Sequence, residues 1–184
     1  MQQTISPTVL DWLRDAHAME NQSVQMLQSQ LPSLAGFPDF RRVVERHAEI
    51  SREQRERLGA RIAELGQAPS MFRDGLGIAL GLSAPMMIAV LPDNVARSAV
   101  ANYAFEHLEI GTYRALIGLT ERAEDQATRK LAESILAQEL EMAAWLEAHL
   151  AQIAAQELPT AEAALRPWRL PFSGGSSLMP LHQG

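Results

Sequence analysis

The chain has 184 residues and a mass of 20.3 kDa, which suits a single domain, and 47% of its residues are hydrophobic, enough to bury a core. A formal net charge of -6 and a pI near 5.4 argue against a nucleic-acid partner, because neutralising phosphates requires clustered lysine and arginine. The sequence has no cysteine, which excludes disulfides, thiolate metal sites and cysteine nucleophiles. A metal ion could therefore be held only by oxygen and nitrogen ligands.

The composition predicts an all-α protein, because alanine, leucine, glutamate and glutamine are plentiful and runs of β-branched residues are missing. Helical periodicity predicts a first helix over residues 9–29. A second is expected over 39–65, with Asp39 as its N-cap and Gly66 in the C′ position. A third runs from Asp93 or Asn94 to about residue 123, and a fourth spans 125–157 and stops before Pro159.

The connections between these helices predict how they are arranged. The links at 30–38 and 122–126 are short, so each joins antiparallel neighbours. Residues 67–92 form a longer, apolar connector, which can return along the second helix and make helices two and three parallel. The expected fold is therefore a four-helix bundle of two antiparallel hairpins joined by a long crossover, and this connectivity is similar to that of ferritin-like proteins.

Three regions bear on domain organisation and location. Residues 1–158 are expected to form the bundle, and residues 159–184 an extended or disordered tail. A docking role toward a protein partner is expected of this tail, since proline, glycine, serine and short apolar anchors alternate there. The uncharged stretch 75–92 is interrupted by glycine and proline, so we expect no membrane span. Residues 1–15 lack the basic and apolar regions of a signal peptide, which makes a cytoplasmic location the expectation.

Each predicted helix carries an apolar stripe at heptad spacing, interrupted by polar residues. The stripes are Leu10, Leu13, His17, Glu20, Val24 and Leu27 in the first helix; Phe40, Val43, His47, Ile50, Gln54, Leu58 and Ile62 in the second; Ala99, Asn102, Glu106, Glu109, Tyr113, Leu116 and Thr120 in the third; and Ala132, Ile135, Glu139, Met142, Leu146, Leu150 and Ile153 in the fourth. Every stripe thus places histidine or glutamate about midway along an otherwise apolar face.

Carboxylates are seldom fully buried unless they are paired or bind a cation, because an isolated buried charge is very costly. Similar groups on four helices therefore indicate a shared metal ion. The candidate ligands are Glu20, His47, Glu106, Glu109 and Glu139. Carboxylate and imidazole suit iron, manganese or zinc, and a di-iron or di-manganese carboxylate centre is the usual arrangement in bundles of this connectivity.

Other interpretations of these residues remain open. A single histidine on an apolar face is often a hydrogen-bonded core residue, which explains His47 as well as metal coordination does. Glu106 would also fit at the boundary of the core. Tyr113 and Asn102 are expected to hydrogen-bond the ligands rather than to bind the metal. The metal hypothesis therefore depends on whether the other three glutamates face one core.

Several segments carry a resemblance to the YciF-like branch of the ferritin-like superfamily. They are residues 11–20, which read Asp-Trp-Leu-Arg-Asp-Ala-His-Ala-Met-Glu; His47-Ala48-Glu49; Tyr103-Ala104-Phe105-Glu106-His107-Leu108-Glu109-Ile110 with Tyr113-Arg114; and Glu139 before Trp145-Leu146. The resemblance covers about residues 9–154. It implies a ferritin-like bundle, frequent homodimers, a di-metal centre in members that keep the ligands, and a link with bacterial stress responses.

The resemblance also bears on individual positions. Glu20, Glu109 and Glu139 match acidic ligand positions, with His47 and Glu106 nearby. The Glu-x-x-His pair familiar from ferritin-like proteins is absent from the sequence. Ile50 stands where relatives carry an acidic residue after the His-x-Glu of the second helix, and Gln138 precedes the ligand of the fourth helix. The loss of a carboxylate on the second helix could leave a single-metal site, a weak site or none.

Two function hypotheses follow. The first is a bundle protein that binds iron or manganese, with oxidase or peroxidase-like chemistry at the metal. The alternative is a metal-free helical interaction or dimerisation module that has lost a complete di-metal site. Ile50 favours the alternative, and the buried-type glutamates favour the first.

Overall fold

The computed structural model describes residues 6–68 and 94–158. In these two ranges the chain forms four long α-helices, one short 3-10 helix and no strand. The elements are α1 (Pro7–Gln30), η1 (Leu31–Gly36), α2 (Pro38–Glu64), α5 (Val95–Arg122) and α6 (Gln126–Ala155). The four predicted helices are confirmed, and their ends agree with the predicted ones to within a few residues. The predicted tail, and the predicted connector from residue 69 onward, lie outside the described residues.

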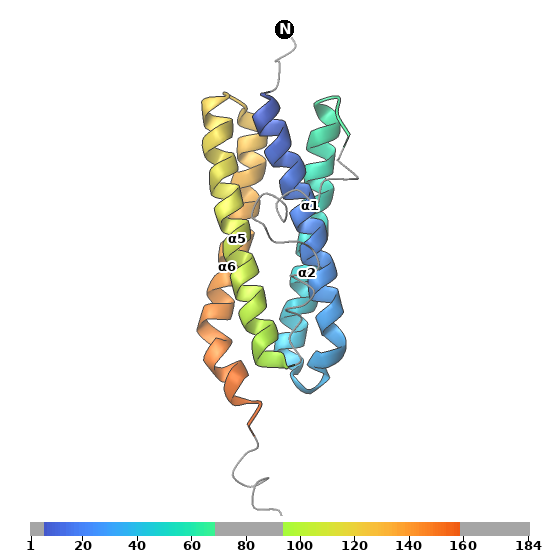
Figure 1. The fold of residues 1–184 in the computed structure, drawn as a ribbon, viewed down its shortest axis with the longest axis vertical. Coiled ribbons are helices and arrows are strands. Elements are labelled where there is room, and N and C mark those ends of the chain that lie inside the picture. Colours follow the sequence, from blue (N-terminus) through green and yellow to red (C-terminus); the bar gives the residue numbers. More distant parts are fainter. Residues whose placement is uncertain (1–5, 69–93, 159–184) are drawn as a thin grey trace, which may run out of the picture.

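The helices are arranged as two antiparallel hairpins, α1 with α2 and α5 with α6, packed side by side (Figure 1). Helix α2 ends at the end of the bundle where α1 begins, and α5 starts at the opposite end. Helices α2 and α5 therefore run in the same direction. This is the connectivity that the loop lengths predicted.

Side-chain caps explain where two of the helices begin. The Asn94 side chain accepts a hydrogen bond from the Arg97 backbone N–H at 2.9 Å, and the Asp125 side chain accepts one from the Thr128 N–H at 3.1 Å. Helix α2 differs from the prediction, because Asp39 is not its N-cap. The helix begins one residue earlier at Pro38, whose ring fixes a helical φ, and the N-cap residue makes no side-chain cap bond.

Replacing Asp125 by alanine is expected to cost about 1–2 kcal/mol of unfolding free energy. The carboxylate caps α6, accepts the Thr128 hydroxyl at 2.6 Å and pairs with Arg61 at 3.0 Å. Urea unfolding of both proteins would measure the loss. Asp39→Ala is the matched control: it removes an exposed aspartate from a first helical turn without removing a cap, so its unfolding free energy should stay within about 0.5 kcal/mol of wild type. Equal losses in both variants would contradict the capping role.

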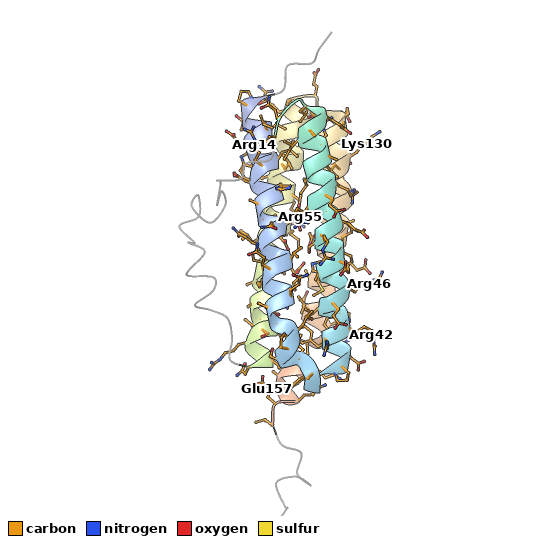
Figure 2. All side chains as sticks on the ribbon, turned by 90° about the vertical axis from the view of Figure 1, so that its right-hand side faces the viewer. Arg14, Arg42, Arg46, Arg55, Lys130 and Glu157 are labelled. Carbon is orange, nitrogen blue, oxygen red and sulfur yellow. The ribbon has the colours of Figure 1, made fainter. Side chains whose placement is uncertain are left out.

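The outside of the bundle is charged and ion-paired (Figure 2). On α2, Arg41 pairs with Glu45 at 2.8 Å and Arg61 with Glu64 at 3.0 Å. Basic and acidic residues of this helix therefore compensate each other's charge on its outer face. No helix among the described residues is both long and apolar enough to cross a membrane.

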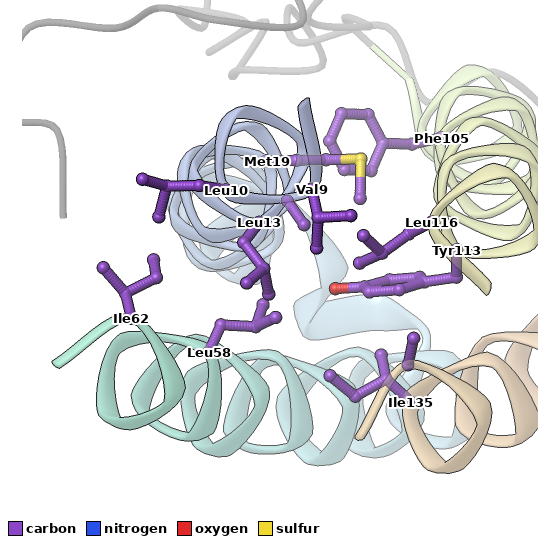
Figure 3. Packing of buried hydrophobic residues seen from close by; sticks show 12 residues of the cluster. Val9, Leu10, Leu13, Met19, Leu58, Ile62, Phe105, Tyr113, Leu116 and Ile135 are labelled. Atoms are coloured by element: carbon purple, nitrogen blue, oxygen red, sulfur yellow. The ribbon is translucent and has the colours of Figure 1, made fainter. Parts of the chain in front are cut away.

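The interior consists of two apolar clusters separated by a polar layer. One cluster includes Leu13, Leu58, Tyr113, Leu116 and Ile135 (Figure 3). The other, toward the η1 end, includes Leu27, Phe40, Val44, Ala99 and Leu146. In each of the four long helices the residues of one cluster precede those of the other along the chain, and the candidate ligands lie at or near the change from one cluster to the other. The apolar clusters therefore close off the polar layer at both ends.

Candidate metal centre

All five predicted ligands are buried inside the bundle. His47 is 2% exposed, and Glu20, Glu106, Glu109 and Glu139 are each 0% exposed. The interpretation of Glu106 as a boundary residue is therefore wrong. One ligand atom from each of His47, Glu106, Glu109 and Glu139 lies within 4.8 Å of the others. Glu20 belongs to the same buried layer but not to this tight group.

The local sequence explains why these side chains face inward. In α5, residues 102, 106, 109 and 113 follow heptad spacing, and all four are buried. In α2, His47, Ser51 and Gln54 are buried at spacings of four and three residues. Ile50, which the predicted stripe placed on the buried face, is only half-buried. The inner face of α2 passes through Ser51 and Gln54 instead.

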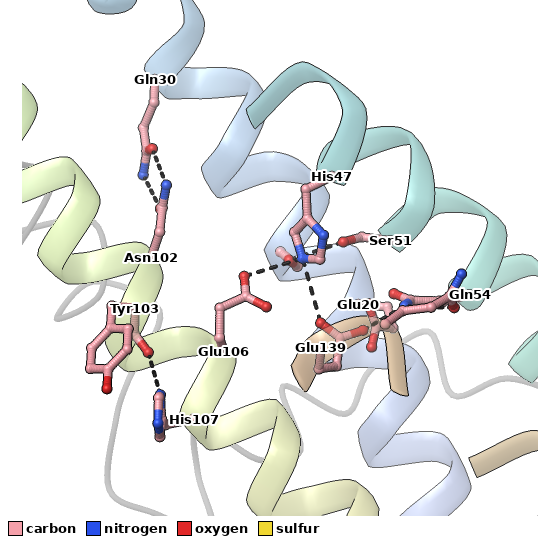
Figure 4. Close-up of polar contacts among 12 residues, drawn as sticks. Glu20, Gln30, His47, Ser51, Gln54, Asn102, Tyr103, Glu106, His107 and Glu139 are labelled. Atoms are coloured by element: carbon pink, nitrogen blue, oxygen red, sulfur yellow. Dashed lines mark hydrogen bonds and ion pairs between the residues drawn. The ribbon is translucent and has the colours of Figure 1, made fainter. Parts of the chain in front are cut away.

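His47 lies between two carboxylates (Figure 4). Its Nε2 atom is 3.1 Å from Glu106 Oε1 and 3.4 Å from Glu139 Oε2. Both are ion-pair distances, but neither contact is aligned as a hydrogen bond. Burial alone would lower the pKa of His47, yet the two carboxylates outweigh it and raise that pKa to about 10. The metal-free layer therefore holds a protonated imidazole at neutral pH.

Glu20, Glu106 and Glu109 each have a raised pKa, which favours their protonated forms when no cation is present. Burial raises the pKa of Glu106 to about 7, although the nearby His47 acts in the opposite direction. Burial, and next the Glu20 carboxylate, raise the pKa of Glu109 well above its usual range. Burial and the Glu139 carboxylate do the same for the pKa of Glu20. Four carboxyl groups in one dry layer cannot all ionise without added positive charge.

The hydrogen bonds of the layer provide a test of whether a cation fits. Among the described residues, eight buried side-chain atoms lack a hydrogen-bond partner, and all eight belong to six residues of this one layer. They are Glu20 Oε2, His47 Nε2, Gln54 Oε1, both oxygens of Glu106, both oxygens of Glu109, and Glu139 Oε2. Buried polar atoms are nearly always satisfied in native proteins. Unsatisfied oxygen and nitrogen atoms converging on one region fit a hard or borderline metal ion.

Two neighbours orient the candidate ligands. The Tyr113 hydroxyl donates a hydrogen bond to Glu20 Oε1, and the Gln54 amide donates one to Glu139 Oε1. Burial and the Glu20 carboxylate raise the pKa of Tyr113, which keeps the phenol protonated as a donor. The predicted role of Tyr113 as a hydrogen-bond partner of a ligand thus matches the structure. Such partners fix the orientation of metal-binding side chains.

Asn102 does not touch a candidate ligand. Its amide forms a reciprocal pair with Gln30, with bonds of 2.9 and 3.0 Å. Ser23 and Ser51 form a second polar pair across α1 and α2 at 3.3 Å. The heptad pattern predicts Gln54 in a buried stripe, but the pattern alone did not assign Gln54 to the site. Its polar side chain at a heptad position was the signal that could have identified it.

Comparisons with known proteins agree with this architecture. Residues 6–159 match a family described as a domain of unknown function, DUF892. A crystal structure of a protein from Xanthomonas campestris superposes with a TM-score of 0.68 at 29% identity, covering 82% of this chain and 93% of that one.

A second structure shares the fold. It is a dodecameric thioferritin, the bacterioferritin-related protein of Bacteroides fragilis, with a TM-score of 0.67 at 22% identity over 89% of this chain and 94% of that one. The predicted ferritin-like four-helix bundle is therefore confirmed. Because the family match extends over most of its length, the chain belongs to the DUF892 family.

Proposed function

We propose that this protein binds iron or manganese in the buried layer, with Glu20, His47, Glu106, Glu109 and Glu139 as the ligands. The observation that carries the proposal is the set of eight unsatisfied buried atoms, all in this layer. Carboxylate and imidazole together suit both metals, and inward-facing glutamates and histidines build the di-metal centres of ferritin-like bundles. The proposal includes two ions per chain, a number that would neutralise four carboxylates and leave His47 uncharged.

The chemistry of such a centre would depend on both the metal and the chain. A redox-active ion with an open coordination position would supply reactivity toward oxygen or peroxide. The chain itself contributes the hydrogen bonds that hold Glu20 and Glu139, and the apolar clusters that keep water away from the layer. His47 and Glu106, with Nε2 and Oε1 3.1 Å apart, compensate each other's charge in the metal-free layer.

The wider biological role is proposed by analogy. The resemblance to the YciF-like branch favours a cytoplasmic protein of the bacterial stress response that acts as a homodimer, and the dodecameric thioferritin makes larger assemblies a further outcome to test. The chain would divide into a metal-binding domain over residues 1–158 and a partner-docking tail over 159–184. The alternative is a metal-free interaction module that has lost a complete di-metal site; it is favoured by the lack of a carboxylate among the buried residues of α2, and metal analysis decides between the two.

Metal analysis tests the proposal directly. Protein purified without chelator, then reconstituted anaerobically with Fe(II) or Mn(II), is expected to retain stoichiometric metal after gel filtration. His47→Gln should weaken that binding by more than about 100-fold, which exceeds the usual effect of losing a residue that only orients a ligand. His149→Gln is the matched control, since His149 is half-buried on α6 outside the layer. A wild-type protein that takes up neither metal would contradict the proposed function.

A further inference from the structure

Gln54 is an uncharged residue in the middle of the acidic layer. It is 0% exposed, and α2 brings to the layer only this amide, His47 and the hydroxyl of Ser51. The four buried carboxylates come from α1, α5 and α6. The donors offered to a cation are therefore unevenly charged, with no carboxylate on the side of α2.

Hydrogen bonds fix which way the Gln54 amide points. Its Nε2 donates to Glu139 Oε1, and also to Gln138 Oε1 at 3.2 Å. A reversed amide would place Gln54 Oε1 against both of these oxygens and would lose both hydrogen bonds. Gln54 Oε1 is consequently left buried and without a hydrogen-bond partner, in the layer where the unsatisfied ligand atoms gather.

The remaining donors divide into a strong and a weak set. The tight group combines one imidazole with the three carboxylates of Glu106, Glu109 and Glu139 within 4.8 Å. Outside that group, the unsatisfied atoms are Glu20 Oε2 and Gln54 Oε1. The other Glu20 oxygen already accepts the Tyr113 hydroxyl. A first divalent cation would have most of the negative charge among its ligands. A second cation would have one carboxylate, one neutral amide and any oxygens that it shares with the first ion.

We propose that the layer binds divalent cations in two steps of unequal affinity, and that Gln54 sets the affinity of the second step. This inference rests on the proposed function and goes beyond it, because it assigns the number and order of the ions to one residue. Gln54 supplies a neutral oxygen to the second cation and simultaneously holds Glu139 through its N–H group. Affinity for the second ion should therefore increase in the order methionine, glutamine, glutamate at position 54.

Titration of metal-free protein with Mn(II) tests the inference, with isothermal calorimetry for affinity and native mass spectrometry for the number of ions. In wild type, the second dissociation constant should exceed the first by at least about tenfold. Gln54→Glu should tighten the second step by about 10- to 100-fold, since the new carboxylate replaces a neutral donor. Gln54→Met, which has a similar length but no amide, should weaken the second step by at least about tenfold.

A second buried glutamine gives the matched control. Gln30 is 4% exposed and pairs with Asn102 outside the layer. Gln30→Glu should lower the melting temperature with and without Mn(II) but leave both binding steps at their wild-type affinity. Gln54→Glu, in contrast, should have a lower melting temperature than wild type when metal-free. Mn(II) should restore that melting temperature, because the new carboxylate then faces a cation.

The outcomes separate this inference from the proposed function. If wild type binds no Mn(II), the proposed function itself fails. If wild type binds two ions with equal affinity, or if both Gln54 variants keep the wild-type second step, metal binding stands and the role of Gln54 is overturned. The methionine variant keeps the test decisive if the glutamate variant does not fold.

Discussion

Glu109→Gln is expected to remove the metal-dependent part of the protein's stability and to leave the metal-free protein at least as stable as wild type. Both Glu109 oxygens are buried and unsatisfied, and Glu20 and Glu139 add like charge around them. An amide of the same shape removes that repulsion, but it also removes a ligand from the tight group. The Glu109 carboxyl therefore lowers the stability of the metal-free protein but contributes to metal binding.

The expected size of this effect follows from ligand linkage. A metal present at 100 times its dissociation constant stabilises the folded state by about 2.7 kcal/mol, and this increment should vanish in Glu109→Gln. Melting curves with Mn(II) and with chelator measure it. Glu133→Gln, on the exposed face of α6, is the control and should keep the full increment. A Glu109 variant that is still stabilised by Mn(II) as much as wild type would contradict the assignment of this residue as a ligand.

The metal-free protein is expected to lose stability as the pH rises from about 5 to about 8, which is unusual for an acidic protein. The pKa of Glu106 rises from 4.5 to about 7 on folding, so the folded state binds more protons than the unfolded state between these values. Stability from this group is present below 4.5 and is lost as the pH rises through about 7. At about 1.4 kcal/mol per pKa unit, Glu106 alone accounts for roughly 3 kcal/mol.

His47 contributes in the same direction at higher pH. Its pKa rises from 6.5 to about 10 on folding, so the stability that its proton provides is present below 6.5 and is lost as the pH rises through about 10. Asp125 acts in the opposite sense, because its hydrogen bonds from Thr128 and Arg61 outweigh partial burial and lower its pKa from 3.8. The change in stability that comes from Asp125 therefore occurs at lower pH than the change that comes from Glu106.

Bound metal should reverse this pH dependence, since cations bind the deprotonated ligands and release their protons. Urea unfolding at about pH 5 and about pH 8, with chelator and with Mn(II), would compare the two forms. Glu106→Gln should flatten the metal-free difference by the contribution of that group. A metal-free wild type whose unfolding free energy is constant or increases across this range would show that the layer does not hold the protons inferred from its burial.

Two interpretations based on the sequence needed the structure to correct them. Ile50 lies three residues after His47, and Ser51 lies four residues after it. Either spacing fits a buried stripe on a helix. Which of them faces the interior depends on how α2 is rotated against its neighbours, and the structure buries Ser51. Asp39 resembled an N-cap, but Pro38 starts the helix before it because its fixed φ suits the first helical turn.

The sequence by itself determined the helices, their connectivity and the inward-facing residues. Periodicity of about 3.6 residues per turn places Glu20, Glu106, Glu109 and Glu139 on buried faces whatever the partner helices are. Cap residues and loop lengths determine where helices begin and which neighbours run antiparallel, and these are local properties. For this reason the fold and the candidate ligands could be predicted from one chain.

Only the tertiary structure decided which turns of the four helices lie at the same height. That alignment joins Tyr113 to Glu20, Gln54 to Glu139, and His47 to carboxylates of two other helices. Sliding one helix along its axis by a single turn would keep every stripe buried and yet separate these pairs. The relative heights are fixed by side-chain packing in the two apolar clusters, and packing between distant segments is not encoded in the periodicity of any single helix.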